Sequence, residues 1–386
     1  MLKSIARPVF RALPSPLQAS LRNLRPDPAI AAFADAGIEV PERDFNNLLH
    51  YLRGEELARL PQQAPCFISV GCAGTWYFNW VQEKCAPQRH IGIEYYAPKP
   101  TDLPGNVEWI ANTAGDMSGI ASGTGDILFS GQNIEHLWPH DIGAFLSESH
   151  RVLKPGGLLV IDSPNRLVTS AQNWSHPEHI LEFTSNEAAE LISAAGFEVE
   201  AVRGMWLCSS KGKPLPFGQL SAARPWPMAR RIADAIDTPA DSFSWWIVAR
   251  KADRSPDPQQ VAALVDKAFK VAWPDRINRI QPNGPGEILV GPRMPLPQGS
   301  YSFGFDLKAR ASGPFATIEV RDGNDRVLAS RTVSAQKLAG RVELTFEIPD
   351  TTFGIQYRVL GLNGAFECRR GVSLTASDSL FSAGRI

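Results

Sequence analysis

The sequence has few cysteines, no excess of either charge and no long apolar run. Its five cysteines are scattered without a CxxC pair, which excludes a disulfide framework or a cysteine zinc site and favours a reducing compartment. The formal net charge is −1, so no global field would hold nucleic acid, and we expect no nucleic-acid partner. No apolar stretch approaches the ~18 residues of a transmembrane helix. These absences favour a soluble globular protein of the cytoplasm.

The length and composition favour two folded units. The chain has 386 residues, with 44% hydrophobic and 20% charged residues, as in ordinary globular proteins. We predict a basic arm over 1–29, an α/β domain over 30–252, a linker and helix over 253–273, and a β-sandwich over 274–386. The two domains are expected to fold separately.

The first 26 residues interleave basic with apolar side chains and contain no acid before Asp27. A transit peptide or a membrane-surface helix has this composition. Pro8, Pro14 and Pro16 break any long helix, however. We therefore predict a short basic arm that packs on the body or stays loose, with peripheral attachment to the inner membrane as the alternative.

Short apolar runs alternate with helical stretches up to residue 252. Helical spacing predicts helices over 45–60, 142–153 and 187–195. The apolar runs predict strands over 66–70, 90–94, 107–110, 126–129, 158–162, 197–202 and 244–250. Strands that alternate with crossovers predict a mostly parallel sheet covered on both faces.

The pattern changes to period two in the last quarter of the chain. Residues 252–258 have the composition of a linker, and a helix is predicted over 259–272. Further on, Tyr301, Phe303 and Phe305 share one strand face, which we assign to the core. Two further faces hold Val342, Leu344, Phe346 and Ile348, and then Phe353, Ile355, Tyr357 and Val359. Such strands predict an antiparallel sandwich.

The segment 68–75 (ISVGCAGT) is predicted to end a strand and to continue as a turn of small residues. A ligand can approach the backbone at this turn. Ala73 and Trp76 replace the second and third glycines of a dinucleotide fingerprint, which disfavours NAD. Glu94 ends the next strand, and its carboxylate can accept hydrogen bonds from both hydroxyls of a ribose. Asp116 can accept from an adenine amino group while Met117 packs on the ring; the alternative for Asp116 is a helix N-cap.

The most specific pattern is GDILFSGQNIEHL at 125–137, followed by a helix and RVLKPGGLLV at 151–160. With the preceding elements, this order resembles class I S-adenosylmethionine-dependent methyltransferases. The resemblance implies a Rossmann-like sheet of seven strands, the last antiparallel, with the cofactor S-adenosylmethionine over the carboxyl ends of strands one to four. The implied cofactor-binding residues are Gly71, Ala73, Gly74, Glu94, Tyr95, Asp116, Met117, Ser130, Gln132 and Asn133. Ser69 departs from the family, because many members carry an acid there.

Histidines follow the fourth and fifth strands. His136 lies in the motif above, and the segment 174–184 (WSHPEHILEFT) resembles a stretch of sugar-modifying methyltransferases. Histidine suits an alcohol acceptor because its pKa lies near neutrality, so His136, His176 and His179 are the candidate catalytic residues. A divalent ion on His176, His179 and Glu182 is the alternative, as is structural hydrogen bonding; the preferred interpretation contains no metal site.

The remaining segments bear on the substrate. The chain inserts about 40 residues between Arg203 and Phe243, with aromatic and basic residues that suit a substrate lid. The C-terminal strands resemble carbohydrate-binding-module-like jelly rolls, which bind glycans or serve oligomerisation and docking, so a homo-oligomer is compatible with them. We predict O-methylation of a sugar of a bacterial surface polysaccharide or its precursor. The alternatives are a small lipid or quinone-like acceptor, and a non-catalytic glycan-binding scaffold.

Overall fold

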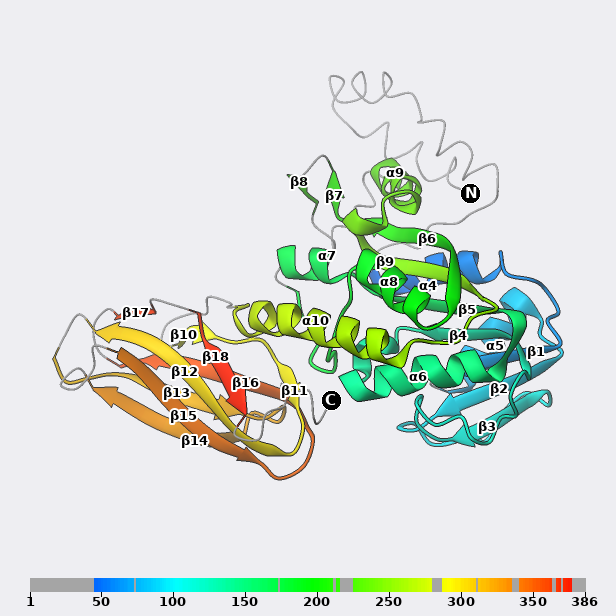
Figure 1. Ribbon diagram of the computed structural model, residues 1–386. Coiled ribbons are helices and arrows are strands. Elements are labelled where there is room, and N and C mark those ends of the chain that lie inside the picture. The colour runs from blue at the N-terminus through cyan, green and yellow to red at the C-terminus, as the bar shows by residue number, and fades with distance from the viewer. Residues whose placement is uncertain are drawn as a thin grey trace, which may run out of the picture.

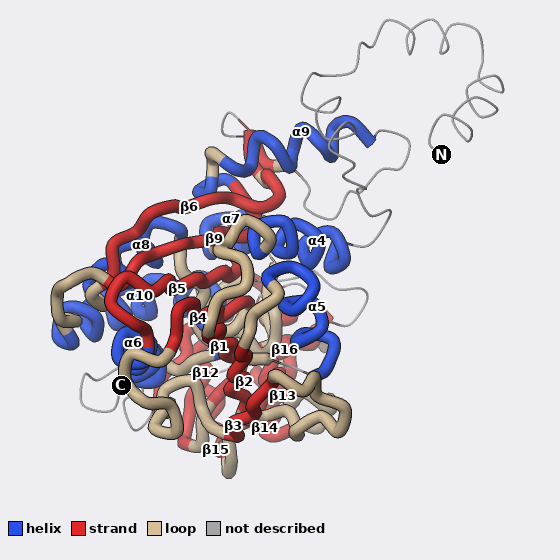
Figure 2. The backbone as a smooth tube through the Cα atoms, turned by 90° about the vertical axis from the view of Figure 1, so that its right-hand side faces the viewer, coloured by secondary structure: helices blue, strands red, loops and turns tan. Residues whose placement is uncertain are grey.

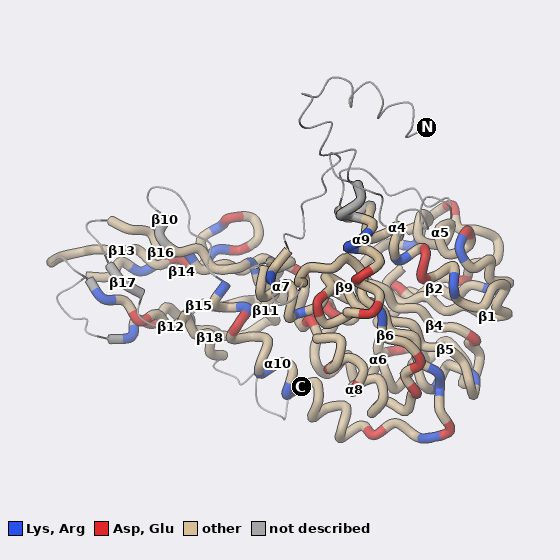
Figure 3. Tube along the Cα trace, turned by 90° about the horizontal axis from the view of Figure 1, so that it is seen from above, with Lys and Arg blue, Asp and Glu red and all other residues tan. Residues whose placement is uncertain are grey.

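The computed structural model describes residues 45–72, 74–172, 174–210, 213–215, 225–279, 287–309, 312–334, 340–362, 366–368 and 371–376. The predicted basic arm and Ala73 lie outside these residues. In Figure 1, the α/β unit and the β-rich unit lie side by side, and helix α10 (Pro258–Ile277) runs between them. Basic and acidic positions are interspersed along the described parts of both units (Figure 3).

A seven-stranded sheet forms the centre of the first unit. Its strands are β1 (Cys66–Val70), β2 (Arg89–Glu94), β3 (Val107–Ala111), β4 (Gly125–Gly131), β5 (Leu153–Pro164), β6 (Phe197–Leu207) and β9 (Ser242–Lys251). Their order is β3-β2-β1-β4-β5-β9-β6. The first five strands pair in parallel, and β9 pairs antiparallel with both β5 and β6. The predicted Rossmann-like sheet with an antiparallel last strand is confirmed.

Helices cover both faces of this sheet, as Figure 2 shows. One face packs on α4 (Phe45–Leu57) and α5 (Thr75–Cys85), with Phe67 and Phe129 in the core. The other packs on α6 (Pro139–Val152), α8 (Ser185–Ala194) and α10, with Ile68 and Leu128 in the core. Neighbouring residues of one strand thus point to opposite layers, which explains why these strands are apolar throughout.

The remaining short elements lie in the connections. They are η1 (Ile134–His136), α7 (Arg166–Ala171), β7 (Ser209–Ser210), β8 (Lys213–Pro214), α9 (Pro225–Ile236) and η2 (Pro239–Asp241). Thr184 caps α8 in a reciprocal capping box with Glu187. None of the described helices is long and apolar enough to span a bilayer.

The second unit consists of antiparallel sheets. One contains β10 (Glu287–Val290), β11 (Met294–Leu296), β13 (Pro314–Arg321), β14 (Val327–Ser334) and β16 (Thr352–Gly361). The other contains β12 (Gly299–Ala309), β15 (Gly340–Ile348), β17 (Phe366–Cys368) and β18 (Ser373–Ala376). The ring of Phe303 on β12 lies 5.2 Å from that of Tyr357 on β16, so residues of both sheets meet in one core.

The predicted period-two faces are buried in this core with one exception. Tyr301, Phe303 and Phe305 are at most 1% exposed, which confirms their place in the core. Phe353 is 41% exposed, and its predicted burial is wrong. Gly354, the next residue, has φ +75°, a left-handed conformation that interrupts the strand alternation at its start.

The segment predicted as a linker is tied to the first unit. Ala252 and Asp257 donate backbone hydrogen bonds to Gly196 and Ala194, and Arg254 donates to the carbonyl of Phe197. Helix α10 then buries one side against α6 and α8, with Val265, Phe269 and Trp273 at most 2% exposed. At the other end, the Tyr357 hydroxyl donates to the carbonyl of Ile277 at 2.9 Å. The domain boundaries remain predictions, and α10 is the element on which both units pack.

We expect a fragment of residues 1–279 to be more stable than one of residues 1–255. The shorter fragment exposes the apolar sides of α6 and α8, and losing a single buried Phe or Trp typically costs about 3–5 kcal/mol. Limited proteolysis of the whole chain with mass spectrometry should give a resistant core that contains α10. A resistant, soluble fragment ending near residue 255 would contradict this and support the sequence-based boundary.

Candidate cofactor and acceptor site

A cleft opens where the first four parallel strands end. Its lining residues come from the carboxyl ends of these strands and from the start of α6: Val70, Gly71, Ile93, Glu94, Tyr95, Tyr96, Asn112, Thr113, Ala114, Gly115, Asn133, His136, Leu137, Trp138 and Asp141. In open parallel sheets, ligands bind at this edge. Gly71, Glu94, Tyr95 and Asn133 thus lie together, as the sequence predicted for a cofactor site.

Gly71 and Asn133 form the floor of the cleft between β1 and β4. Gly71 has φ +74°, and a Cβ on it would lie 2.6 Å from Oδ1 of Asn133, so the chain requires glycine there. The Asn133 side chain donates in turn to the buried hydroxyl of Ser130 at 3.1 Å. Ser130 therefore acts through Asn133. Gly74 caps the start of α5 with φ +90°.

Glu94 ends β2 with its side chain held in place. One carboxylate oxygen accepts from the amides of Tyr96 (2.7 Å) and Ala97 (3.0 Å), and the residue is 8% exposed. These bonds fix the carboxylate toward the cleft. Tyr95 and Tyr96 follow, 61% and 81% exposed, with their rings 5.1 Å apart. Two solvated aromatic rings at the edge of a cleft can stack on a ligand.

Five predicted cofactor residues among the described ones do not line the cleft: Gly74, Asp116, Met117, Ser130 and Gln132. Asp116 is exposed and its carboxylate accepts from the amide of Ser118, as in a turn cap. Met117 is fully buried in the core. Gln132 turns away, because its side chain donates to Asp162 at 2.8 Å and to Ser244 at 3.1 Å. Asn112 and Thr113 line the cleft in place of Asp116 and Met117, and their position directly after β3 was the available signal.

Asp162 anchors helix α4 to the sheet. It is fully buried at the end of β5 and forms an ion pair of 2.8 Å with Arg53 of α4. The Arg53 guanidinium lies 5.3 Å from the ring of Trp80 and 5.9 Å from that of Phe129. Burial raises the pKa of Asp162, and the charge of Arg53 opposes that rise. Gln132, which was predicted to bind the cofactor, instead donates a hydrogen bond to Asp162 of this buried pair.

Ser69, which departs from the family pattern, pairs with a second buried residue. Its hydroxyl lies 2.7 Å from Nε2 of His90 on β2, and both side chains are fully buried. Burial lowers the pKa of His90 to about 3. A neutral Ser–His pair therefore occupies the interior below the cleft, where a carboxylate would bring a charge.

We predict that His90 makes stability depend on pH between about 6.5 and 3. The folded imidazole stays neutral, whereas the unfolded one takes a proton below about pH 6.5, so its contribution is complete above that pH and is lost as pH falls. As the pH falls from 6.5 to 4.5, one such group lowers the free energy of unfolding by about 2–3 kcal/mol. Urea unfolding at both pH values should show a loss smaller by this amount in His90→Gln. Equal losses in the two proteins would refute the assignment.

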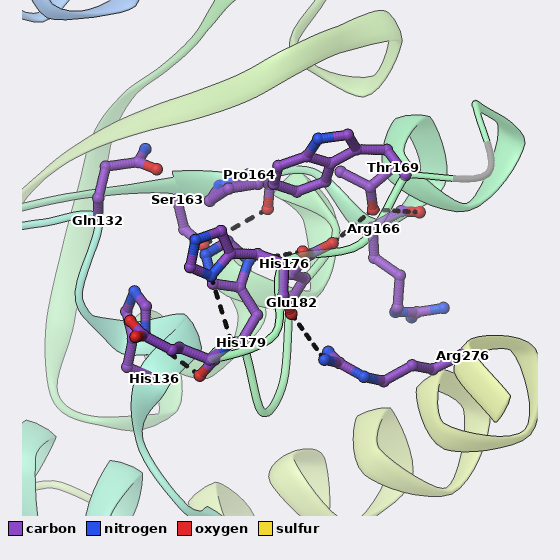
Figure 4. Close-up of polar contacts among 12 residues, drawn as sticks. Gln132, His136, Ser163, Pro164, Arg166, Thr169, His176, His179, Glu182 and Arg276 are labelled. Atoms are coloured by element: carbon purple, nitrogen blue, oxygen red, sulfur yellow. Dashed lines mark hydrogen bonds and ion pairs between the residues drawn. The ribbon is translucent and has the colours of Figure 1, made fainter. Parts of the chain in front are cut away.

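The three candidate catalytic histidines form one cluster, shown in Figure 4. The ring of His179 lies 4.8 Å from that of His136 and 4.6 Å from that of His176. His136 lines the cleft, and its Nδ1 lies 3.2 Å from the carbonyl oxygen of Glu178. His179 is 5% exposed, with Nδ1 2.7 Å from Glu182. The structure thus brings all three to one end of the cleft.

The loop that carries His176 and His179 is held from two sides. The amides of Ile180 and Leu181 donate to the carbonyl of Glu135 at 2.6 and 3.1 Å. From α10, Arg276 donates to the carbonyl of His176 at 2.7 Å. Arg279, just past α10, donates to the carbonyl of Trp174. The loop therefore has a fixed path between η1 and α10.

The ionisation of this cluster follows from its burial. Desolvation lowers the pKa of His136 to about 3, and the neighbouring histidines add to the shift. Desolvation also lowers the pKa of His176. Burial alone would raise the pKa of Glu182, but the hydrogen bonds from His179 and Thr169 outweigh it and lower the pKa. The imidazoles of His136 and His176 are thus neutral, whereas Glu182 favours its ionised form.

The predicted lid between Arg203 and Phe243 is described in part. Trp206 is fully buried under the guanidinium of Arg231, 4.0 Å from its ring, and thus belongs to the core. The carbonyl of Leu215 accepts from the Gln172 side chain at 2.8 Å, which ties the insertion to the loop after α7. Phe217 and Arg224 lie outside the described residues. The lid remains a prediction.

Residues 68–161 match the methyltransferase domain family. A probable S-adenosylmethionine-dependent methyltransferase of Mycolicibacterium smegmatis is 41% identical over 83 residues, which are 21% of this chain and 32% of that protein. A probable S-adenosylmethionine-dependent methyltransferase of Mycobacterium tuberculosis is 36% identical over 83 residues, 21% of this chain and 30% of that protein. The chain thus spans about a third of the length of the curated relatives it matches.

Among solved structures, a methyltransferase bound to the Trm112 activator of Haloferax volcanii is similar with a TM-score of 0.41 and 15% identity, over 60% of this chain and 100% of that one. The 1,6-didemethyltoxoflavin-N1-methyltransferase of Burkholderia thailandensis is similar with a TM-score of 0.36 and 16% identity, over 63% and 92%.

Proposed function

We propose that this chain is an S-adenosylmethionine-dependent methyltransferase. The observation that carries the proposal is the cleft at the carboxyl ends of β1 to β4, with the fixed carboxylate of Glu94 at its side. The methyltransferase domain match covers strands β1 to β5 and so includes the cleft. The curated relatives, described as S-adenosylmethionine-dependent, support the same cofactor.

The residues of the cleft fit this cofactor. Glu94 would accept hydrogen bonds from the ribose hydroxyls, since one carboxylate oxygen accepts from the amides of Tyr96 and Ala97 and leaves the other to a ligand. Gly71, which excludes a Cβ, lets the ligand approach the backbone. Asn112 and Thr113 would contact the base. S-Adenosylmethionine supplies an electrophilic methyl group to the acceptor.

We predict that Glu94→Ala weakens binding of S-adenosylmethionine or its demethylated product by about 1–3 kcal/mol, the cost of losing charge-assisted hydrogen bonds. Calorimetry on the intact protein and the variant measures this. Glu94→Gln should keep the bonds to the amides of Tyr96 and Ala97 through its one oxygen, and should lose affinity because its NH2 group cannot accept from a ribose hydroxyl.

Glu198→Ala is the matched control, because Glu198 is an exposed acid on β6, at the far edge of the sheet. Its affinity should equal that of the intact chain. Absence of binding by the intact protein would refute the methyltransferase proposal, whereas unchanged affinity in Glu94→Ala would refute only this assignment.

The acceptor we propose is a hydroxyl group, activated at the histidine cluster. The hydroxyl oxygen attacks the methyl carbon, the carbon–sulfur bond breaks with its electron pair going to sulfur, and the hydroxyl proton leaves to a base or to water. An alcohol has a pKa far above neutrality, so the proton must be removed as the bond forms. His136 is the member of the cluster that lines the cleft, and the loop between η1 and α10 fixes it against His179.

The acceptor class we favour is a sugar of a bacterial surface polysaccharide or its precursor. Support comes from the exposed Tyr95 and Tyr96 beside the cleft, because aromatic faces suit sugar rings, and from the β-rich second unit, whose strand pattern resembles jelly rolls. A homo-oligomer built through that unit belongs to the same proposal. A lipid or quinone-like acceptor would instead use the basic arm at a membrane surface. The cleft and its ordered carboxylate favour an enzyme over a scaffold.

We predict that alanine variants of His136, His176 and His179 divide into two groups. Loss of a histidine that activates the acceptor should lower the rate by a factor of about 10²–10⁴, with the melting temperature and the cofactor affinity unchanged. A histidine that only orders the loop should lower the melting temperature. Turnover with glycan acceptors, thermal unfolding and calorimetry on each variant separate the groups. Full activity in all three variants would place activation elsewhere.

A further inference from the structure

Glu135 is a buried carboxyl group that the proposed methyl transfer leaves without a role. The residue is fully buried, and neither of its side-chain oxygens has a hydrogen-bond partner of ordinary geometry among the described residues. An isolated carboxylate in such a place is costly, so either a proton or a cation must offset its charge.

Two imidazoles lie beside this carboxyl group. Glu135, His136 and His179 each place one ligand atom within 4.8 Å of those of the other two. Metal–nitrogen bonds of 2.0–2.1 Å put tetrahedral ligands about 3.4 Å apart. The three ligand atoms therefore need to approach one another by at most about 1.4 Å to hold one ion.

The hydrogen bonds around the cluster direct both imidazoles inward. Nδ1 of His136 faces the carbonyl oxygen of Glu178, which only accepts, so this nitrogen carries the proton. Nδ1 of His179 lies 2.7 Å from a carboxylate oxygen of Glu182, so this nitrogen also donates. With the proton on Nδ1, Nε2 of each ring carries a lone pair that can bind a cation. An outer carboxylate that orients a ligating histidine is typical of metal sites.

We propose that Glu135, His136 and His179 bind a divalent transition-metal cation. Two imidazoles and one carboxylate form the donor set of open catalytic sites, in which three protein ligands leave a position for water or substrate. Imidazole donors favour ions such as Zn²⁺ or Co²⁺ over Ca²⁺ and Mg²⁺, which prefer oxygen. Glu182 is a positioning residue that acts through His179.

This set differs from the His176, His179 and Glu182 set considered from the sequence. Glu182 is occupied by His179 and Thr169, and both its oxygens are used. The side chain of His176 lies 3.3 Å from the amide of Glu178 through its Nδ1. Glu135 takes the place of Glu182 as the carboxylate, because it precedes His136 on η1 and points into the same buried space.

The role of this site rests on the proposed methyltransferase function. His136 lines the cleft, so the open side of the cation would face an acceptor hydroxyl there. A cation lowers the pKa of a bound hydroxyl by withdrawing electron density, which lets the proton leave to water as the oxygen attacks the methyl carbon. Cation binding itself requires neither cofactor nor acceptor and is therefore testable separately.

The test is calorimetric titration of the whole chain with Zn²⁺, Co²⁺ and Mg²⁺ after treatment with a chelator, without cofactor or acceptor. We expect one Zn²⁺ or Co²⁺ per chain, weaker binding of Mg²⁺, and a Co²⁺ absorption spectrum typical of nitrogen ligation. Glu135→Gln and His179→Ala should each weaken Zn²⁺ binding by more than about 100-fold. Glu182→Gln should weaken it by about 10–100-fold, the usual effect of losing an outer partner. Melting temperatures show which variants remain folded.

His140→Ala is the matched control, since His140 is an exposed histidine of α6 whose side chain is 59% exposed. It should bind Zn²⁺ as the intact chain does. Unchanged binding in Glu135→Gln and His179→Ala, or no binding of Zn²⁺ and Co²⁺ by the intact chain, overturns the site. If Glu135→Gln does not fold, His179→Ala and the Co²⁺ spectrum decide. Turnover that persists in chelator would leave the methyltransferase proposal standing, whereas a loaded chain that binds no S-adenosylmethionine would refute that proposal and not the site.

Discussion

The hydrogen bonds that hold the loop at 174–184 are the constraint on which the candidate site depends. Arg276 is fully desolvated, and burial lowers its pKa to about 10. Its guanidinium donates to the carbonyl of His176 and also to that of Arg293, in the second unit. A buried guanidinium is expensive unless its donors are satisfied. The pairing of these carbonyls with Arg276 therefore fixes both the histidine loop and the approach of the second unit.

Helix α10 joins the α/β unit to the β-rich unit, because it packs against both. Its apolar side completes the layer of α6 and α8, and its carboxyl end meets Tyr357 of the second unit. The second unit thus contributes to the site without lining the cleft, since the residues around Arg276 hold the loop that carries His176. A carbohydrate-binding role for that unit would add to this structural role.

Below the cleft, the chain replaces charges with neutral or paired groups. Ser69 and His90 form a neutral pair, and Asp162 is matched by Arg53. Glu135 differs from Asp162, because neither of its two side-chain oxygens has a hydrogen-bond partner of ordinary geometry among the described residues, whereas one oxygen of Asp162 pairs with Arg53.

The sequence by itself determined the strands, their mostly parallel sheet and the residues at strand ends, such as Gly71 and Glu94, whereas the antiparallel last strand was implied by the resemblance to methyltransferases. Period and turn chemistry are local, and the carboxyl ends of parallel strands must converge on one edge. Only the tertiary structure decided that Met117 and Trp206 enter the core, that Gln132 turns toward Asp162, and that Glu135 joins His136 and His179. These outcomes depend on which side of a loop faces solvent and which distant element packs against it, and neither is encoded in residue spacing.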